Sequence, residues 1–142
     1  MITTAAGRGH TIRAHTADEI LEAWGPTREA CLEEAVLGLV STVADVDGVG
    51  WSWHRAVELA GTDEELLVAL LEEVIFDLDT SGELPVRVLV RPHADGVVAH
   101  LWLAHLARVT ARGATPKGVA YSQLTMREER PGRWRCRVTI DV

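Results

Sequence analysis

The sequence predicts an α+β protein in which two helices pack on a mixed or antiparallel sheet to form a two-layer sandwich. Apolar residues recur at helical spacing in two separate segments of the first half of the chain. Apolar and polar residues alternate in several other segments, and four of these follow one another in the second half. Helices grouped against a sheet, rather than alternating regularly with strands, are typical of the α+β class.

The length of 142 residues is sufficient for one domain with a hydrophobic core. We expect residues 10–142 to form this single domain, because no repeat and no linker-like segment divides them. Residues 1–9 are mostly small or polar and contain no long apolar stretch. We therefore expect them to form a flexible N-terminal tail.

The first half of the chain begins with two short predicted strands, at residues 10–14 and 19–23. Gly25-Pro26 then interrupts the pattern, and Thr27 has the side chain of a helix N-cap. The helix is predicted to reach residue 43, because apolar residues recur at intervals of three and four. These residues are Leu32, Ala35, Val36, Leu39, Val40 and Val43.

A further strand is predicted at residues 51–59, and Gly61 ends it. Thr62 and Glu65 have the spacing of a capping box, which marks the start of the second helix. That helix is apolar almost all round as far as Phe76. Because such a helix is usually covered on several sides, it is our candidate for the centre of the core.

The second half contains four predicted strands, joined by two hairpin turns and one loop. The turn signals are Asp95-Gly96 and Pro131-Gly132, and residues 104–117 form the loop. The last strand alternates regularly, with Cys136 on its apolar face and Asp141 on its polar face. The four strands are residues 84–91, 97–103, 118–127 and 134–142.

The charge and the cysteine content limit the classes of function. A net charge of −7 argues against a general nucleic-acid or membrane-surface protein, because both normally need a basic surface. We therefore expect no direct nucleic-acid binding and no membrane association. No apolar run is long enough to cross a bilayer, and no secretory h-region is present. Cys31 and Cys136 are expected to be buried, reduced thiols, and the expected location is the cytoplasm.

The first and last segments each carry a carboxylate that points to a metal site. Asp18 follows the first predicted strand, and Asp141 is next to the α-carboxylate of Val142. If these segments meet, three carboxylates gather in one place, and their repulsion favours a hard divalent cation as partner. Asp18, Asp141 and Val142 are therefore the candidate ligands. An ordinary surface ion pair from Asp141 to Arg135 or Arg137 is the alternative interpretation.

Two further residues could support this site. His15 lies three residues before Asp18, where it could orient that carboxylate or simply cap the local turn. Lys117 is the only lysine of the chain, and it could contact a partner or an anion, or lie exposed without a role. The six histidines form no zinc motif, and the chain contains neither a phosphate-binding glycine loop nor a nucleophile elbow.

Several segments together resemble the Archease family, in the order expected for the family and over nearly the whole chain. The opening motif His15-Thr16-Ala17-Asp18 and the ending Asp141-Val142 are the most specific parts of the resemblance. The other matching segments are Glu22-Ala23-Trp24-Gly25-Pro26-Thr27, residues 64–79, Lys117-Gly118-Val119-Ala120-Tyr121 and the last strand.

The resemblance implies a protein cofactor rather than an enzyme. Archeases assist the RtcB-type RNA ligase of tRNA splicing and RNA repair, by promoting its guanylylation and its repeated turnover. The resemblance also implies a calcium site formed by Asp18, Asp141 and Val142. Glu19 adds a carboxylate where the family usually has an apolar residue, and we expect His15, Glu19 and Lys117 to be outer-shell or partner contacts.

Two other functions stay open at this point. One is a small metal-dependent hydrolase that uses the same carboxylates to hold its ion, although only His15 offers an evident base. The other is an interaction domain stabilised by calcium or magnesium, without any role in RNA metabolism.

Overall fold

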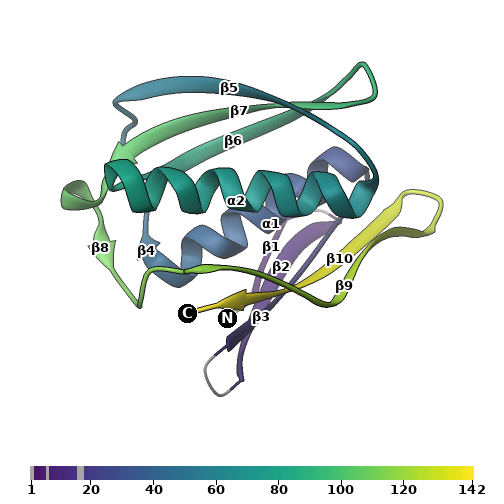
Figure 1. The fold of residues 1–142 in the computed structure, drawn as a ribbon, viewed down its shortest axis with the longest axis horizontal. Helices are drawn as coiled ribbons and strands as arrows, with labels where there is room; N and C mark the ends of the chain where they lie inside the picture. The colour runs from purple at the N-terminus through teal and green to yellow at the C-terminus, as the bar shows by residue number, and fades with distance from the viewer. Residues whose placement is uncertain (1, 6, 16–17) are drawn as a thin grey trace.

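The computed structural model describes residues 2–5, 7–15 and 18–142. Figure 1 shows two long helices, α1 (Arg28–Val43) and α2 (Asp63–Ser81), and a short 3-10 helix η1 (Leu106–Arg108) follows later in the chain. The strands are β1 (Ile2–Ala5), β2 (Arg8–His15), β3 (Asp18–Gly25), β4 (Ala44–Asp45), β5 (Trp53–Ala60), β6 (Glu83–His93), β7 (Gly96–His105), β8 (Thr110–Ala111), β9 (Gly118–Arg130) and β10 (Arg133–Asp141).

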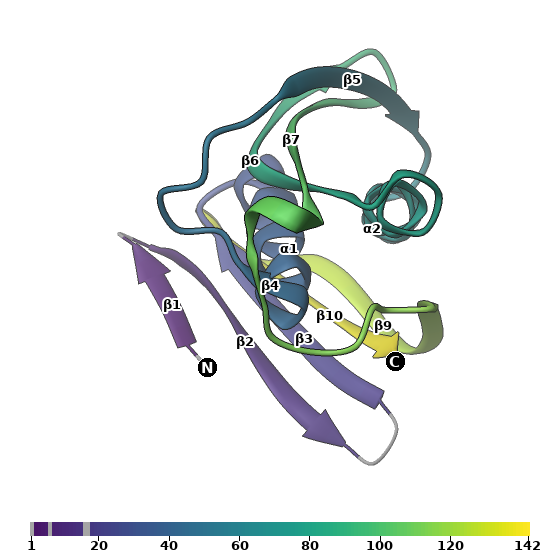
Figure 2. The same ribbon diagram turned by 90° about the vertical axis from the view of Figure 1, so that its left-hand side faces the viewer.

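The helices lie between two antiparallel sheets, as Figure 2 shows. One sheet has five strands in the order β1-β2-β3-β10-β9, and the other has three in the order β5-β7-β6. The short strands β4 and β8 pair separately. Every pairing among the described strands is antiparallel, and the predicted α+β class is confirmed. The long strands divide between two sheets, whereas the sequence predicted a single sheet layer.

The centre of the core is α1, so the prediction that α2 would occupy it is wrong. α1 packs against β2, β3 and β10 on one side and β6 on the other. By contrast, α2 lies beside α1 and leaves Phe76 59% exposed. The sequence did not indicate this arrangement, because α1 carries Glu33 and Glu34 and charged residues do not suggest a buried helix. Both glutamates are buried despite their charge.

Both predicted helix caps are present. The Thr27 hydroxyl accepts a hydrogen bond from the amide of Ala30 at 3.0 Å. At α2 the capping box is complete, since Thr62 accepts from the Glu65 amide at 3.3 Å and Glu65 accepts from the Thr62 amide at 2.8 Å. These bonds satisfy amides that would otherwise lack a partner in the first turn.

Among the residues that the structure describes, regular secondary structure begins before residue 10, within the segment for which a flexible tail was predicted. Ile2–Ala5 form β1 and pair with β2, which begins at Arg8 rather than at residue 10. The Arg8 side chain reaches α1 and forms ion pairs with Glu33 and Glu34 at 2.8 and 2.6 Å. These two contacts explain why regular structure begins earlier than apolar patterning alone indicated.

The second half follows the prediction closely. The β6-β7 and β9-β10 hairpins turn at residues 94–95 and 131–132, next to or at the predicted signals. The predicted loop contains η1 and the short strand β8. On β10, Cys136, Val138 and Ile140 are fully buried and the intervening residues are only partly covered, which confirms the predicted alternation. Cys31 and Cys136 are buried free thiols, as expected. Among the described residues, no helix combines the length and the apolar character needed to span a membrane.

Candidate functional site

The first and last strands meet at one end of the five-stranded sheet. β3 and β10 pair antiparallel, and the register sets Asp18 directly opposite Asp141. On the outer sides of this pair, the backbone of His15 in β2 lies opposite Asp18, and Gly118 in β9 lies opposite Asp141. The segments named by the sequence therefore come together in one row across four strands.

Asp18 and Asp141 share the outer face of the sheet. Successive side chains of a strand point to opposite faces, and the neighbouring Leu21 and Ile140 are fully buried on the inner face. Directly opposite residues of an antiparallel pair lie on the same face with Cβ atoms about 5 Å apart. The two carboxylates are therefore close neighbours on one surface, and both are partly covered.

The arginines of β10 do not neutralise this pair. Arg135 donates to Glu22 at 3.0 Å, and Arg137 donates to Gln123 at 3.2 Å. Within the described part of the chain, no hydrogen bond or ion pair connects the side chain of Asp18 or Asp141 to another residue. The alternative of an ordinary Asp141–arginine ion pair is therefore not what the structure contains.

The surroundings of Asp141 leave its outer face accessible. The amide of Lys117 donates to the Asp141 carbonyl at 2.7 Å, which fixes the start of β9 against the end of β10. Gly118 has no side chain, and a Cβ built at this position would meet nothing within 4 Å. Because like charges directly opposite each other destabilise a strand pair, this open position favours a cation from outside the chain.

The available oxygen donors suit a hard cation, but they are too few to complete its coordination shell. Carboxylate oxygens and main-chain oxygens are the ligands that calcium and magnesium prefer. Over the described residues, no group of three or more His, Cys, Asp or Glu side chains is arranged to hold a metal ion. An ion at this place would be held by Asp18, Asp141 and an oxygen of Val142, with water or a partner supplying its other ligands.

The other predicted site residues do not all lie beside the Asp18–Asp141 pair. Glu19 lies opposite the buried Ile140 and borders a pocket that Ser41, Thr42 and Arg112 also line, so it faces the inner side of the sheet. Glu19 and Asp18 face opposite sides of the sheet because adjacent residues of a strand alternate, so Glu19 does not extend the acidic pair on the outer face. The side chain of His15 lies outside the described residues, and only its backbone position is known.

Lys117 is exposed and lies at the entrance of a surface groove between α2 and the start of β9. The groove has a volume of about 690 Å³. Apolar Ile75 and Phe76 line it together with the acidic Glu72 and Asp79. The candidate site thus consists of two carboxylates without a partner among the described residues, and Lys117 and the groove lie at the start of the neighbouring strand β9.

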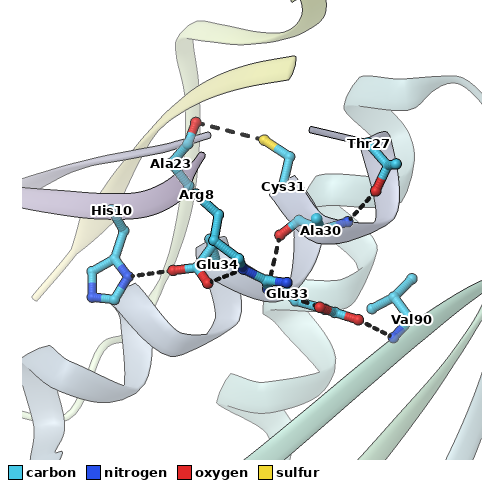
Figure 3. Close-up of polar contacts among 9 residues, drawn as sticks. All are labelled: Arg8, His10, Ala23, Thr27, Ala30, Cys31, Glu33, Glu34 and Val90. Atoms are coloured by element: carbon cyan, nitrogen blue, oxygen red, sulfur yellow. Dashed lines mark hydrogen bonds and ion pairs between the residues drawn. The ribbon is translucent and has the colours of Figure 1, made fainter. Parts of the chain in front are cut away.

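The structure also contains a buried polar cluster that sequence reasoning missed (Figure 3). Glu34 accepts from Arg8 at 2.6 Å, and one of its oxygens lies 3.1 Å from Nδ1 of His10. Glu33 accepts from Arg8 at 2.8 Å and from the amide of Val90 in β6 at 2.8 Å. The cluster thereby joins α1 to both sheets, which is a structural role.

The electrostatics of this buried cluster are balanced internally. Burial alone would raise the pKa of Glu34, but hydrogen bonds and charges from His10 and Arg8 outweigh it and the pKa is lowered. The only available signal in the sequence was a pair of glutamates within an otherwise apolar helix. Because acidic residues early in a helix are also explained by the helix dipole, that signal did not indicate burial.

Comparison with known proteins identifies the family. Residues 10–142 match the model of the Archease protein family (MTH1598/TM1083). The chain belongs to the Archease family. Among curated relatives, a probable archease of Mycobacterium tuberculosis is 42% identical over 135 residues, which are 94% of this chain and 75% of that protein. An archease of Methanosarcina mazei is 26% identical and covers 96% of this chain and 97% of its own length.

A solved structure supports the same fold. The solution structure of Methanobacterium thermoautotrophicum protein 1598 matches with a TM-score of 0.73 at 23% identity. The match covers 94% of this chain and 98% of that chain. The resemblance to archeases predicted from the sequence motifs is therefore confirmed for both family and fold.

Proposed function

We propose that this archease-family protein activates an RtcB-type RNA ligase in tRNA splicing and RNA repair, by promoting the ligase's guanylylation and its repeated turnover. It acts in the cytoplasm as a protein cofactor and catalyses no reaction itself. Family membership supports the proposal.

The observation that carries the proposal is the Asp18–Asp141 pair at the end of the five-stranded sheet. Both carboxylates lack a protein partner among the described residues, and the open position at Gly118 leaves room beside them. Such an acidic end is complementary to a basic cleft that binds nucleotide and RNA. Charge complementarity of this kind accelerates encounter and fixes the orientation in which two proteins dock.

A divalent cation, calcium in the first instance, is proposed to bind at the acidic pair. Asp18, Asp141 and a main-chain oxygen of Val142 would hold it, because hard cations prefer oxygen donors. When bound, the ion would supply positive charge that offsets the repulsion between the two carboxylates. Lys117 and the adjacent groove would contact the ligase.

The test is multiple-turnover RNA ligation by the RtcB-type ligase of the same organism, with and without this protein. The Asp18→Asn and Asp141→Asn variants remove the charges of the pair with little change in size. Asp95→Asn, in the β6-β7 turn, is the matched control because it removes one exposed carboxylate elsewhere. Wild type and control should stimulate ligation, and the two site variants should not.

The outcomes separate the proposal from its alternatives. An active ligase that does not respond to the wild-type protein would contradict the proposed activation. Calcium binding without stimulation would favour an interaction domain, and turnover of a phosphoester by this protein alone would favour a hydrolase. Full stimulation by Asp18→Asn and Asp141→Asn would remove the acidic pair from the mechanism.

A further inference from the structure

The three-stranded sheet has an outer face that no described helix or strand covers (Figure 2). The inner face of its central strand β7 is fully buried, through Val97, Ala99, Leu101 and Leu103. The alternate residues of β7, including His100 and Trp102, therefore point away from the helices. In Figure 2 this outer face points away from the five-stranded sheet and from the C-terminus of the chain.

Planar side chains line this face in a continuous group. Trp102 in the central strand has His54 of β5 directly opposite on one side and Arg87 of β6 on the other. The ring centroids of His54 and Trp102 are 4.9 Å apart, and the Arg87 guanidinium lies 4.6 Å from the Trp102 ring centroid. His100 stacks on His54 with centroids 5.1 Å apart and an angle of 14° between the rings.

Hydrogen bonding orders the two imidazoles without using all their polar atoms. His54 Nε2 and His100 Nδ1 are 2.9 Å apart, and one donates to the other. Each ring retains its second nitrogen for another partner. Together with Trp102 and Arg87, these rings form what we call the stacking face, defined by His54, Arg87, His100 and Trp102.

The outer face of the three-stranded sheet is less acidic than the chain as a whole. Arg87 and Arg91 are exposed on the outer face of β6, and neither forms an ion pair with a described carboxylate. The one carboxylate on the outer face of β5, Glu58, lies 2.5 Å from His93. The stacking face is therefore bordered by two available cations and by an acid that already has a basic partner.

We propose that the stacking face binds single-stranded nucleic acid, with unpaired bases against Trp102 and the histidine pair and with phosphates on Arg87 and Arg91. Proteins hold single strands without reading sequence by stacking bases on aromatic and guanidinium planes of a sheet, next to cations that bind the backbone. On the stacking face, His54 and Arg87 are exposed and Trp102 is half-buried. The net charge of −7 predicted no such contact, but phosphate binding depends on the local surface rather than on the sum.

This inference does not depend on the proposed activation of a ligase. The stacking face and the Asp18–Asp141 pair belong to different sheets. The isolated protein should bind a single strand even if it stimulates no ligase. A protein with both properties would be able to contact RNA with one sheet and a partner protein with the other.

The experiment is a fluorescence anisotropy titration of labelled ten-nucleotide RNA and DNA single strands, and of a matched duplex, with the full-length protein. The single strands should bind with a Kd of about 10⁻⁴ to 10⁻⁶ M at physiological salt, the range of sequence-independent binding. Tighter binding of RNA than of DNA would assign the 2′-hydroxyl a role, whereas equal binding would assign recognition to bases and phosphates alone. Trp102→Ala should weaken binding of the single strands about 5- to 150-fold, because it removes a stacking platform.

The controls separate stacking from charge and from folding. Tyr121→Ala removes an exposed aromatic ring from β9 and should leave binding unchanged. Arg91→Gln should lower the slope of log K against log salt by about 0.7, the value for one phosphate contact with a single strand. Trp102→Tyr retains an aromatic ring and should recover most of the affinity, with thermal unfolding followed for every variant.

Three results would overturn the inference. They are the absence of saturable binding by the wild-type protein, equal affinity in Trp102→Ala, and preference for the duplex. As a check that needs no variant, amide chemical shifts of the wild-type protein should change on β5, β6 and β7 when the single strand is added. Shift changes confined to the five-stranded sheet would contradict binding at the stacking face. Binding of acidic peptides with the same affinity would contradict the choice of nucleic acid as the partner.

Discussion

Glu34 in α1 is buried and Asp141 in β10 is only partly covered, and the fold surrounds the two carboxylates differently. Glu34 is 6% exposed and has Arg8 and His10 within hydrogen-bonding distance. Asp141 faces another carboxylate across the strand pair, and the nearby arginines bind elsewhere. The Glu34 carboxylate is therefore satisfied within the protein, whereas no residue that the structure describes neutralises Asp141. This difference is what distinguishes a structural charge from a candidate functional one.

The largest expected effect comes from breaking the balanced cluster. Glu34→Gln removes the charge that faces Arg8 and His10 and leaves the Arg8 guanidinium with one carboxylate fewer. We expect the free energy of unfolding to fall by about 3 kcal/mol, as when a buried ion pair loses one member. Urea denaturation measures this change.

The matched control for that variant is an exposed pair. Glu129→Gln removes the partner of Arg133, at 3.6 Å on the surface. Because exposed pairs contribute about 0–1 kcal/mol, its effect should be clearly smaller. Equal losses in the two variants would contradict the structural role assigned to Glu34.

Acid should destabilise the protein through the buried carboxylate of Glu34. Desolvation by burial acts to raise the pKa of Glu34. The contacts with His10 and Arg8 have the opposite and larger effect, so the pKa lies below its usual value of 4.5. A lowered pKa in the folded state gives stability that is present above the usual pKa and is lost as the pH falls through the folded value. Wild-type stability should therefore decrease below about pH 4.5, and the Glu34→Gln variant should show a weaker decrease in the same window. Unfolding curves at a series of pH values test this, and parallel profiles would contradict it.

The smallest expected effect has the opposite sign. In the presence of a chelator, Asp141→Asn should raise the free energy of unfolding by about 0.2–1 kcal/mol, because it removes repulsion from Asp18. Asp18→Asn should give a similar gain, and the double variant should gain little more than either single one. Additive gains would show that the two carboxylates do not interact, and a loss in either single variant would reveal an internal partner.

The sequence predicted most of the elements because local signals were strong. The Thr27 cap, the Thr62–Glu65 capping box and the alternation of β10 depend on neighbours in sequence, and all three are confirmed. The pairing of Asp18 with Asp141 was also anticipated, from charge and from the family motifs. Patterns of this kind need no knowledge of the distant packing.

The errors arose where distant parts of the chain meet. The start of β2 at Arg8 depends on ion pairs to Glu33 and Glu34, which lie 25 and 26 residues away. α1 occupies the central position although it carries the same two glutamates. Glu33 and Glu34 made its sequence less apolar than expected for a buried helix. Glu19 was expected to be an outer-shell or partner contact, and strand alternation places it on the face opposite Asp18. The stacking face has no local signal, since His54 and Trp102 meet only through the pairing of β5 with β7.

The most direct test of the comparison is the effect of calcium on thermal unfolding of the wild type, Asp141→Asn and Glu34→Gln. A ligand that binds only the folded state stabilises it by about 2.7 kcal/mol at 100 times its Kd. The account predicts that calcium raises the melting temperature of the wild type and of Glu34→Gln, which starts lower, but not that of Asp141→Asn. An equal increase in Asp141→Asn, or no increase in the wild type, would contradict the claim that the unpartnered carboxylates await a cation.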